Sequence, residues 1–137
     1  MTGLKKTFDD LRAKNKKIAI VSGSILNIYE FFKSRYGVKA DCVSFAAEIL
    51  FDQNGEIVGG DFNNYDYEGK VEAIEKICGQ MGISMKECAM VGDSRNDIFA
   101  FRKVGVSIAF NPKYPEVEKE ANFVIKEKDL TKVLPLV

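Results

Sequence analysis

The segment that decides the fold is CAMVGDSRND, residues 88–97. Its first four residues, Cys88 to Val91, form a continuous apolar run, which is typical of a strand that is buried on both faces. Gly92-Asp93-Ser94 ends this run, and a helix is expected through Asp97 to Lys103. A buried strand that leads through a polar turn into a helix is the unit from which parallel α/β sheets are built.

The same unit recurs on both sides of this segment. Ile18 to Val21 is a second apolar run, and Ser22-Gly23-Ser24 ends it and offers an N-cap for a helix that stops at Gly37. The other expected strands lie at 106–110 and 123–125, and the other helices at 4–15, 71–81, 115–120 and from 129 onward.

One part of the sequence departs from this alternation. From Cys42 to Phe62 the apolar pattern shifts toward a period of two, and Asn54-Gly55 lies between two apolar runs, which is a strong hairpin signal. We therefore predict an α/β, Rossmann-like fold, in which a mostly parallel sheet is flanked by helices and a β-hairpin is inserted near residues 47–60. No repeat, low-complexity tract or linker divides the chain, so residues 1–137 are expected to form one domain.

Composition narrows the possible chemistry. The chain has 137 residues, of which 46% are hydrophobic, and 20 Lys and Arg balance 20 Asp and Glu. Zero net charge without blocks of like charges provides no electrostatic footprint for nucleic acid or for an anionic membrane. The chain has no His, which excludes Ser-His-Asp and Cys-His nucleophile activation and His-ligated zinc. Carboxylate, Lys, Ser, Thr and Cys chemistry remains.

The cysteines and the N-terminus bear on location. Cys42, Cys78 and Cys88 are odd in number and form no C-x-x-C pair, which favours free thiols in a reducing compartment. The first residues lead directly into a charged amphipathic segment, so no signal peptide is expected, and no apolar run approaches the length of a membrane span. We predict a cytoplasmic protein that binds neither nucleic acid nor membrane.

Polar residues stand where the predicted strands end. Ligands of open parallel sheets bind beside the carboxyl ends of the strands. The residues at these ends, or at the start of the intervening helix, are Ser22, Lys70, Asp93, Asn96, Asp97 and Asn111. A hydroxyl and backbone N–H groups bind phosphoryl oxygens, Lys adds a positive charge, and carboxylates suit Mg²⁺. The set therefore favours a magnesium-dependent phosphoryl-transfer site.

Each of these residues also has an ordinary structural explanation. Ser22 or Ser24 can cap a helix, and Lys70 can be a solvated helix lysine. Asp93 and Asp97 can be first-turn carboxylates that stabilise the helix dipole. The dipeptide Asn111-Pro112 is a common turn opener. Taken singly, none of them establishes a site.

Taken together and in this order, the motifs resemble the haloacid dehalogenase (HAD) superfamily and, within it, the phosphoserine-phosphatase-like branch. The motifs that carry this resemblance are Ile18-Ala-Ile-Val-Ser22-Gly23, Lys70 and Val91-Gly92-Asp93-Ser-Arg-Asn96-Asp97. Outside them the resemblance includes the 4–11 helix, the hairpin around Gly55, and the segments 108–111 and 121–125. The G-D-x-x-N-D segment is its most specific part.

The resemblance implies a role for each residue. Ser22 holds a phosphoryl oxygen, Gly23 lets the backbone approach the phosphate, and Lys70 neutralises both the phosphate and the nucleophile. Asp93 ligates Mg²⁺, and Asp97 is an outer or water-mediated partner of the metal. Asn96 orders its loop or contacts the substrate, and Asn111 is grouped with the substrate-binding residues. The implied substrate is a small phosphorylated metabolite.

The chain departs from the family pattern at one point. The family's nucleophile and its acid/base aspartate lie in a D-x-D-x-T motif on a strand between the Ser-motif and G-D-x-x-N-D strands, and this sequence contains no such motif. We expect the chain to begin after that strand and after the cap insertion. The two flanking strands, 18–21 and 88–91, are then expected either to pair directly in a contracted sheet or to receive a strand from a partner chain or a second copy, because unpaired strand edges recruit partners.

Three functions remain open on these grounds. The chain is the larger part of a Mg²⁺-dependent phosphomonoesterase whose nucleophilic aspartate comes from outside it. Alternatively, it is a catalytically inactive phosphatase-like module that binds phosphate or Mg²⁺. A flavodoxin-like receiver is the third possibility, but it requires an acidic cluster at the end of the first strand, which is absent.

Overall fold

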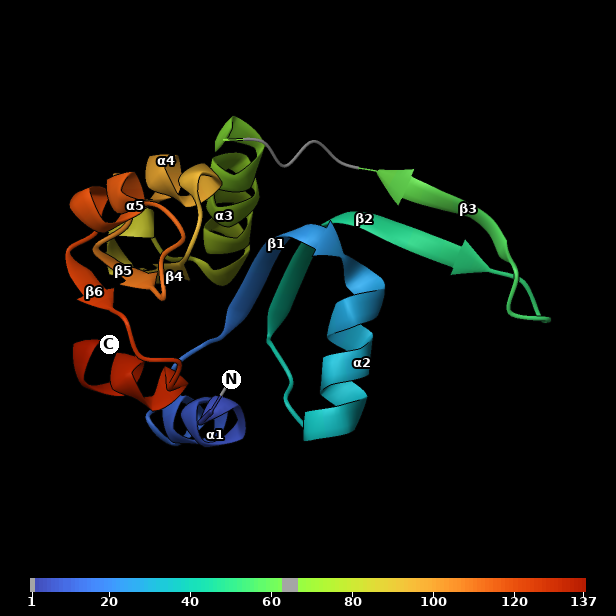
Figure 1. Ribbon diagram of the computed structural model, residues 1–137, viewed down its shortest axis with the longest axis horizontal. Coiled ribbons are helices and arrows are strands. Elements are labelled where there is room, and N and C mark those ends of the chain that lie inside the picture. The colour runs from blue at the N-terminus through green and yellow to red at the C-terminus, as the bar shows by residue number, and fades with distance from the viewer. Residues whose placement is uncertain (1, 63–66) are drawn as a thin grey trace.

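The computed structural model describes residues 2–62 and 67–137 and contains two three-stranded sheets (Figure 1). The first sheet has the strands β1 (Ala19–Ile25), β2 (Cys42–Phe51) and β3 (Ile57–Phe62), in that order. The second has β4 (Ala89–Gly92), β5 (Val106–Phe110) and β6 (Phe123–Ile125). The helices are α1 (Leu4–Ala13), α2 (Leu26–Tyr36), α3 (Tyr67–Met81), α4 (Ile98–Phe101) and α5 (Pro115–Glu120), with 3₁₀ turns η1 (Met85–Glu87), η2 (Arg95–Asp97) and η3 (Leu130–Leu136).

The predicted fold class is confirmed. β1 and β2 pair in parallel, as do β4 with β5 and β5 with β6, while β2 and β3 form an antiparallel hairpin. The hairpin turn contains Gly55, whose φ of 81° is a conformation that glycine adopts readily. Asp52 fixes this turn, because its Oδ1 accepts hydrogen bonds from the backbone N–H groups of Asn54 and Glu56 at 2.8 and 2.9 Å.

Three local expectations were wrong. β1 continues through Ser22 and Gly23 to Ile25, and Ile25 precedes α2 without a side-chain cap, so Ser22 neither ends the strand nor caps the helix. The expected 97–103 helix is divided into η2 and the short α4, because Ser94 and Asp97 form a capping box around a 3₁₀ turn. The terminal helix is 3₁₀ in type and contains Pro135.

The two sheets do not join. β1 and β4 are each an edge strand, and among the described residues no backbone pairing connects them. The expected direct pairing in a contracted sheet is therefore wrong. The two sheets are linked instead by α3, which contacts both β1 and η2. The arrival of a strand from another chain stays a prediction.

The core lies in separate clusters on the two sheets. Phe8, Ile18 and Tyr29 pack with Val38 and Ala40 beneath the first sheet. In the second sheet β5 is central: Ile108 and Phe110 pack toward Ile125 and Val133, while Ala109 packs against Phe101 and Val117. The alternation along β5 shows that this strand is buried on both faces, as its apolar sequence predicts.

The chain ends hold the two halves together. The Thr2 N–H donates to the Lys128 carbonyl at 3.1 Å, and the Leu130 N–H donates to the Thr2 carbonyl at 3.0 Å. α1 consequently lies against η3, as Figure 1 shows at the blue and red ends of the chain. No helix in the described part of the chain is long and apolar enough to cross a membrane.

Gly105 is the tightest glycine position outside the turns. A Cβ atom there would lie 1.9 Å from the Lys86 carbonyl oxygen, which is backbone and cannot move away easily. We predict that Gly105→Ala lowers the free energy of unfolding by about 2 kcal/mol or more, as overpacked sites do, measured by urea denaturation. Gly79→Ala is the matched control, since a Cβ at this α3 position meets nothing within 4 Å, and it should be neutral or slightly stabilising. Equal effects of the two substitutions would contradict the packing argument.

Candidate functional site

A buried ion pair joins the start of α3 to the loop after β4. The Lys70 Nζ lies 2.6 Å from the Asp97 Oδ1, and the two side chains are only 8% and 4% exposed. Lys70 occupies the first turn of α3, and Asp97 ends η2. The sequence did not predict this direct contact, and because Lys70 is buried, its explanation as a solvated helix lysine is wrong.

The second oxygen of Asp97 shapes its own loop. Asp97 Oδ2 accepts hydrogen bonds from the backbone N–H groups of Asp93 at 2.9 Å and of Ser94 at 3.0 Å. Gly92 is required at the start of this loop, because a Cβ there would lie 2.5 Å from the Asp97 carboxyl carbon. Asp97 is thus fully occupied by Lys70 and by backbone donors, and it holds the loop in place.

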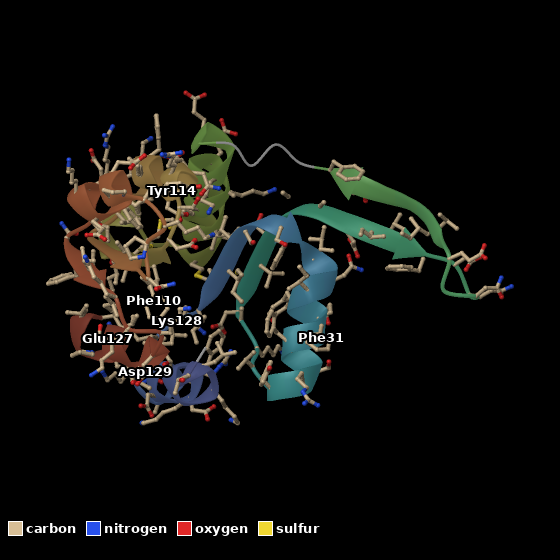
Figure 2. The ribbon with its side chains drawn as sticks, viewed as in Figure 1. Phe31, Phe110, Tyr114, Glu127, Lys128 and Asp129 are labelled. Carbon is tan, nitrogen blue, oxygen red and sulfur yellow. The ribbon has the colours of Figure 1, made fainter. Side chains whose placement is uncertain are left out.

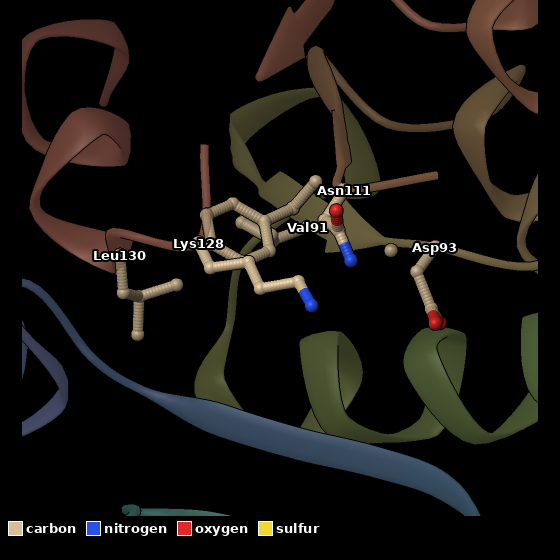
Figure 3. Close-up of a pocket in the computed structure, with 7 residues that line it drawn as sticks. Val91, Asp93, Asn111, Lys128 and Leu130 are labelled. Carbon is tan, nitrogen blue, oxygen red and sulfur yellow. The ribbon is translucent and has the colours of Figure 1, made fainter. Parts of the chain in front are cut away.

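Asp93 faces a cavity beside the carboxyl ends of β4 and β5. The cavity measures about 390 Å³, and its lining includes Asp93, Phe110 and Asn111 (Figure 3). Asn111 follows β5 with a φ of 45° and donates its backbone N–H to the Ile125 carbonyl, so the end of β6 fixes its position. Asp93 and Asn111 therefore lie beside the same edge of the second sheet, as their positions directly after β4 and β5 predict.

Two lysines that the sequence reasoning missed lie at the same place. The Lys113 Nζ is 2.7 Å from the Asp93 Oδ2, and this contact raises the pKa of Lys113. Lys128 lines the cavity, and Figure 3 shows its side chain extending toward Asn111. Their positions in the sequence were a signal for this placement. Lys113 closely follows β5 and Lys128 closely follows β6, and ligands of parallel sheets bind beside the carboxyl ends of such strands.

The carboxyl end of β1 approaches this loop through Gly23. A Cβ on Gly23 would lie 3.9 Å from the Asn96 Nδ2, an ordinary van der Waals distance, so the strand and the loop are neighbours here. The Asn96 Oδ1 is buried and has no hydrogen-bond partner among the described residues. The Ser22 Oγ accepts a hydrogen bond from the Ser24 N–H at 3.1 Å. An unpaired buried acceptor is costly, which favours a donor from a ligand or an added segment at Asn96.

The site residues thus form two connected groups. Lys70, Asp97 and Asp93 are linked by direct contacts, and Asn96 and Gly23 approach each other beside them. In the described ranges 2–62 and 67–137, no three His, Cys, Asp or Glu side chains come close enough to hold a metal by themselves. The assignment of Asp93 and Asp97 as metal residues stays a prediction, with Asp93 as the carboxylate whose side chain reaches the cavity.

The thiols lie outside this site. The three cysteines are free, and the Sγ atoms of Cys78 and Cys88 are 3.3 Å apart. Burial, together with the contact to Cys78, raises the pKa of the Cys88 thiol to about 11. A thiol that stays protonated at neutral pH is a poor nucleophile.

Known proteins share this sequence and this arrangement. The profile of the haloacid dehalogenase-like hydrolases matches residues 1–105. The phosphoserine phosphatase of Methanocaldococcus jannaschii is 30% identical over 139 residues, which cover 96% of this chain and 61% of that protein. The phosphoserine phosphatase of Saccharomyces cerevisiae is 30% identical over 125 residues, 90% of this chain and 39% of that protein. The chain thus spans less than two thirds of the length of either relative.

Solved structures agree with the sequence comparison. A crystal structure of apo phosphoserine phosphatase superimposes with a TM-score of 0.84 at 27% identity, over 99% of this chain and 66% of that one. A substrate-bound phosphoserine phosphatase complex gives a TM-score of 0.83 at 28% identity, over 99% and 63%. With its G-D-x-x-N-D loop held by the Lys70–Asp97 pair, the chain belongs to the haloacid dehalogenase-like hydrolases, in their phosphoserine-phosphatase-like branch.

Proposed function

We propose that this chain is a Mg²⁺-dependent phosphomonoester hydrolase, or the larger part of one, whose nucleophilic aspartate is supplied from outside residues 1–137. The observation that carries the proposal is the loop 93–97, which the buried Lys70–Asp97 pair fixes at the carboxyl edge of the second sheet. Two relatives that are 30% identical to this chain are phosphoserine phosphatases, which makes phosphoserine the first substrate to test.

The residues at the cavity can supply part of the coordination shell of Mg²⁺. Mg²⁺ prefers carboxylate oxygens and typically takes one or two of them, completing its octahedron with water and substrate phosphate. Asp93 lines the cavity with a half-exposed carboxylate, of which Oδ2 is paired with Lys113, whereas Asp97 is buried and both of its oxygens accept hydrogen bonds. We therefore assign Asp93 as the direct ligand and Asp97 as the residue that positions the Asp93 backbone. Magnesium bound there would neutralise phosphate charge.

The other residues are assigned to the phosphate. The Lys70 ammonium carries three donors, of which one goes to Asp97, so it retains donors for a phosphoryl oxygen. The Ser22 hydroxyl and the backbone at Gly23 bind a second oxygen, and Asn96 and Asn111 contact the substrate. Positioning and electrostatic stabilisation supply most of the catalysis of phosphoryl transfer, so this set determines the rate once a nucleophile is present.

The nucleophile is the part that we assign to another segment. The sequence has no D-x-D-x-T motif, and both β1 and β4 present an unpaired edge. A strand with that motif, from a longer form of the polypeptide or from a separate chain, would pair with these edges and bring an aspartate to the cavity. It would also provide polar groups beside Asn96, whose buried oxygen lacks a partner among the described residues.

The missing motif supports a second candidate function. A phosphatase-like module without a nucleophile would bind phosphate or Mg²⁺ at Asp93 and Lys70 and would hydrolyse no phosphate ester. In either case we place the protein in the cytoplasm, which the three free cysteines support.

The two functions differ in one measurement. We expect residues 1–137 alone to release no phosphate from O-phosphoserine or an aryl phosphate in the presence of Mg²⁺. Adding a D-x-D-x-T strand, by extending the natural reading frame upstream or by mixing in a second chain, should produce turnover that EDTA abolishes. Phosphate and Mg²⁺ binding without turnover in the complemented protein would establish the inactive module. Turnover by residues 1–137 alone would refute the external nucleophile.

Asp93→Asn tests the metal assignment. The amide keeps the shape of the side chain but lacks the negative charge, so Mg²⁺ affinity should fall by about tenfold or more, as measured by calorimetry with the metal alone. Asp9→Asn, which removes an exposed carboxylate in α1, should leave the affinity unchanged. If both variants bind Mg²⁺ like the parent chain, Asp93 is not a ligand.

Lys70→Met tests the buried pair. The substitution leaves Asp97 charged and buried without its cation, so the free energy of unfolding should fall by about 3–5 kcal/mol, measured by urea denaturation. Phosphate binding should be lost as well. Lys76→Met, the same change at an exposed position of the same helix, should alter stability by no more than about 0.5 kcal/mol. Similar values for the two variants would show that the pair does not organise the site.

A further inference from the structure

The loop that follows β5 is fastened to the G-D-x-x-N-D loop at Asp93. We call residues 111–114 the β5 loop. Its Lys113 contacts Asp93 twice: the backbone N–H of Lys113 donates to the Asp93 carbonyl at 3.0 Å, and the Lys113 Nζ lies 2.7 Å from the Asp93 Oδ2. The backbone contact fixes where the lysine side chain starts, and the ion pair fixes where it ends. The proposed function gives Lys113 no part, although this lysine touches the carboxylate that is assigned to the metal.

Both ends of the β5 loop are held in place. At its start, the Asn111 N–H donates to the carbonyl of the last residue of β6. At its end, the Tyr114 ring packs against Arg95 of the G-D-x-x-N-D loop, with 3.9 Å between the guanidinium carbon and the ring centroid. Arg95 also pairs with Glu116 of α5, and Figure 2 shows Tyr114 beside this helix. The lysine side chain therefore extends from a fixed backbone.

The ion pair between Lys113 and Asp93 contributes little to stability. Its side chains are 61% and 46% exposed, whereas those of the Lys70–Asp97 pair are buried. Exposed ion pairs change the free energy of unfolding only slightly, because water and salt screen the charges. The effect of the pair is instead expected on the Asp93 carboxylate itself. An exposed side chain samples several rotamers, and a contact at one oxygen removes that freedom before a ligand binds.

The contact engages one oxygen of the carboxylate and leaves the other. We propose that Lys113 is a positioning residue for Mg²⁺: its ammonium holds the Asp93 Oδ2, so that the Oδ1 of the same carboxylate is left for the ion. This inference rests on the proposed function, which assigns Asp93 as the direct ligand. Carboxylates that bind metals are commonly held by such outer partners, and the loss of one typically lowers metal affinity by about 10- to 100-fold.

A cation beside the ligand also opposes the metal through charge repulsion. Two observations limit this repulsion. The Lys113 side chain is largely exposed, so water and ions screen its charge. Its contact is with the Oδ2 of Asp93, so the ammonium does not occupy the oxygen that is assigned to Mg²⁺. We expect the gain from a fixed carboxylate to exceed the cost of the repulsion, and the direction of the change in metal affinity tests this expectation.

Lys113→Met tests the positioning role. The substitution removes the ammonium but keeps an unbranched side chain and the backbone N–H that binds the Asp93 carbonyl. We expect the dissociation constant for Mg²⁺, measured by calorimetry with the metal alone, to rise about tenfold. Lys113→Arg, whose guanidinium also binds carboxylates, should stay close to the parent affinity.

Lys126→Met is the matched control. It removes another exposed lysine from an ion pair, in this case with Glu118 at 3.1 Å, and should leave the Mg²⁺ affinity unchanged. Urea denaturation of each variant should give the same midpoint as the parent, because both ion pairs are exposed. A lowered midpoint for Lys113→Met that accompanies its loss of affinity would indicate a merely structural role and overturn the proposal.

The remaining outcomes separate this inference from the proposed function. If Lys113→Met binds Mg²⁺ as tightly as the parent or more tightly, while Asp93→Asn binds it weakly, Asp93 is a ligand and the positioning role alone is refuted. If Lys113→Arg does not recover the affinity that Lys113→Met loses, the ion pair is not the cause of the loss, and the positioning role is refuted as well. A parent chain that binds no Mg²⁺ refutes the metal assignment and the positioning role together.

Discussion

The contact between Lys70 and Asp97 is the interaction on which the site depends. A charge buried without a partner costs several kcal/mol, so the two residues stabilise the fold only as a pair. Their pairing ties the first turn of α3, which enters from the hairpin, to the loop that follows β4. Because the second oxygen of Asp97 accepts hydrogen bonds from the backbone N–H groups of Asp93 and Ser94, the same carboxylate fixes the backbone of this loop.

The surrounding backbone is adapted to this pair. Gly92 leaves the space that the Asp97 carboxyl group fills. α3 can therefore hold the two sheets in a fixed relation although β1 and β4 do not pair. The contacts of Thr2 with Lys128 and Leu130 connect the sheets a second time, at the opposite side. The relation between the two sheets therefore depends on these helix and terminal contacts, and not on strand pairing.

Much of the fold and of the candidate site could be predicted from the sequence, and the physical reason differs from one element to the next. The apolar run 106–110 and the Asn54-Gly55 turn are local signals, and both gave the correct element. The G-D-x-x-N-D segment placed Asp93 and Asp97, because local spacing in a strand–turn–helix unit fixes which side chains face the edge. Ser22 was misjudged, since a hydroxyl after an apolar run signals a cap equally well whether or not the strand continues. The meeting of Lys113 with Asp93 was missed, because it depends on how the β5 loop folds back, which no local pattern specifies.

The open strand edges and the exposed β2–β3 hairpin are two different kinds of unsatisfied surface. The edges of β1 and β4 lack backbone partners, which only another strand in register can supply. The β2–β3 hairpin has its backbone paired, and what it lacks is cover for Phe51, Ile57 and Phe62. A strand that completed the sheet would enter between β1 and β4, on the side of the site, and would leave the β3 side of the first sheet unchanged. A strand supplied at the edges of β1 and β4 would therefore leave the apolar side chains of the hairpin exposed.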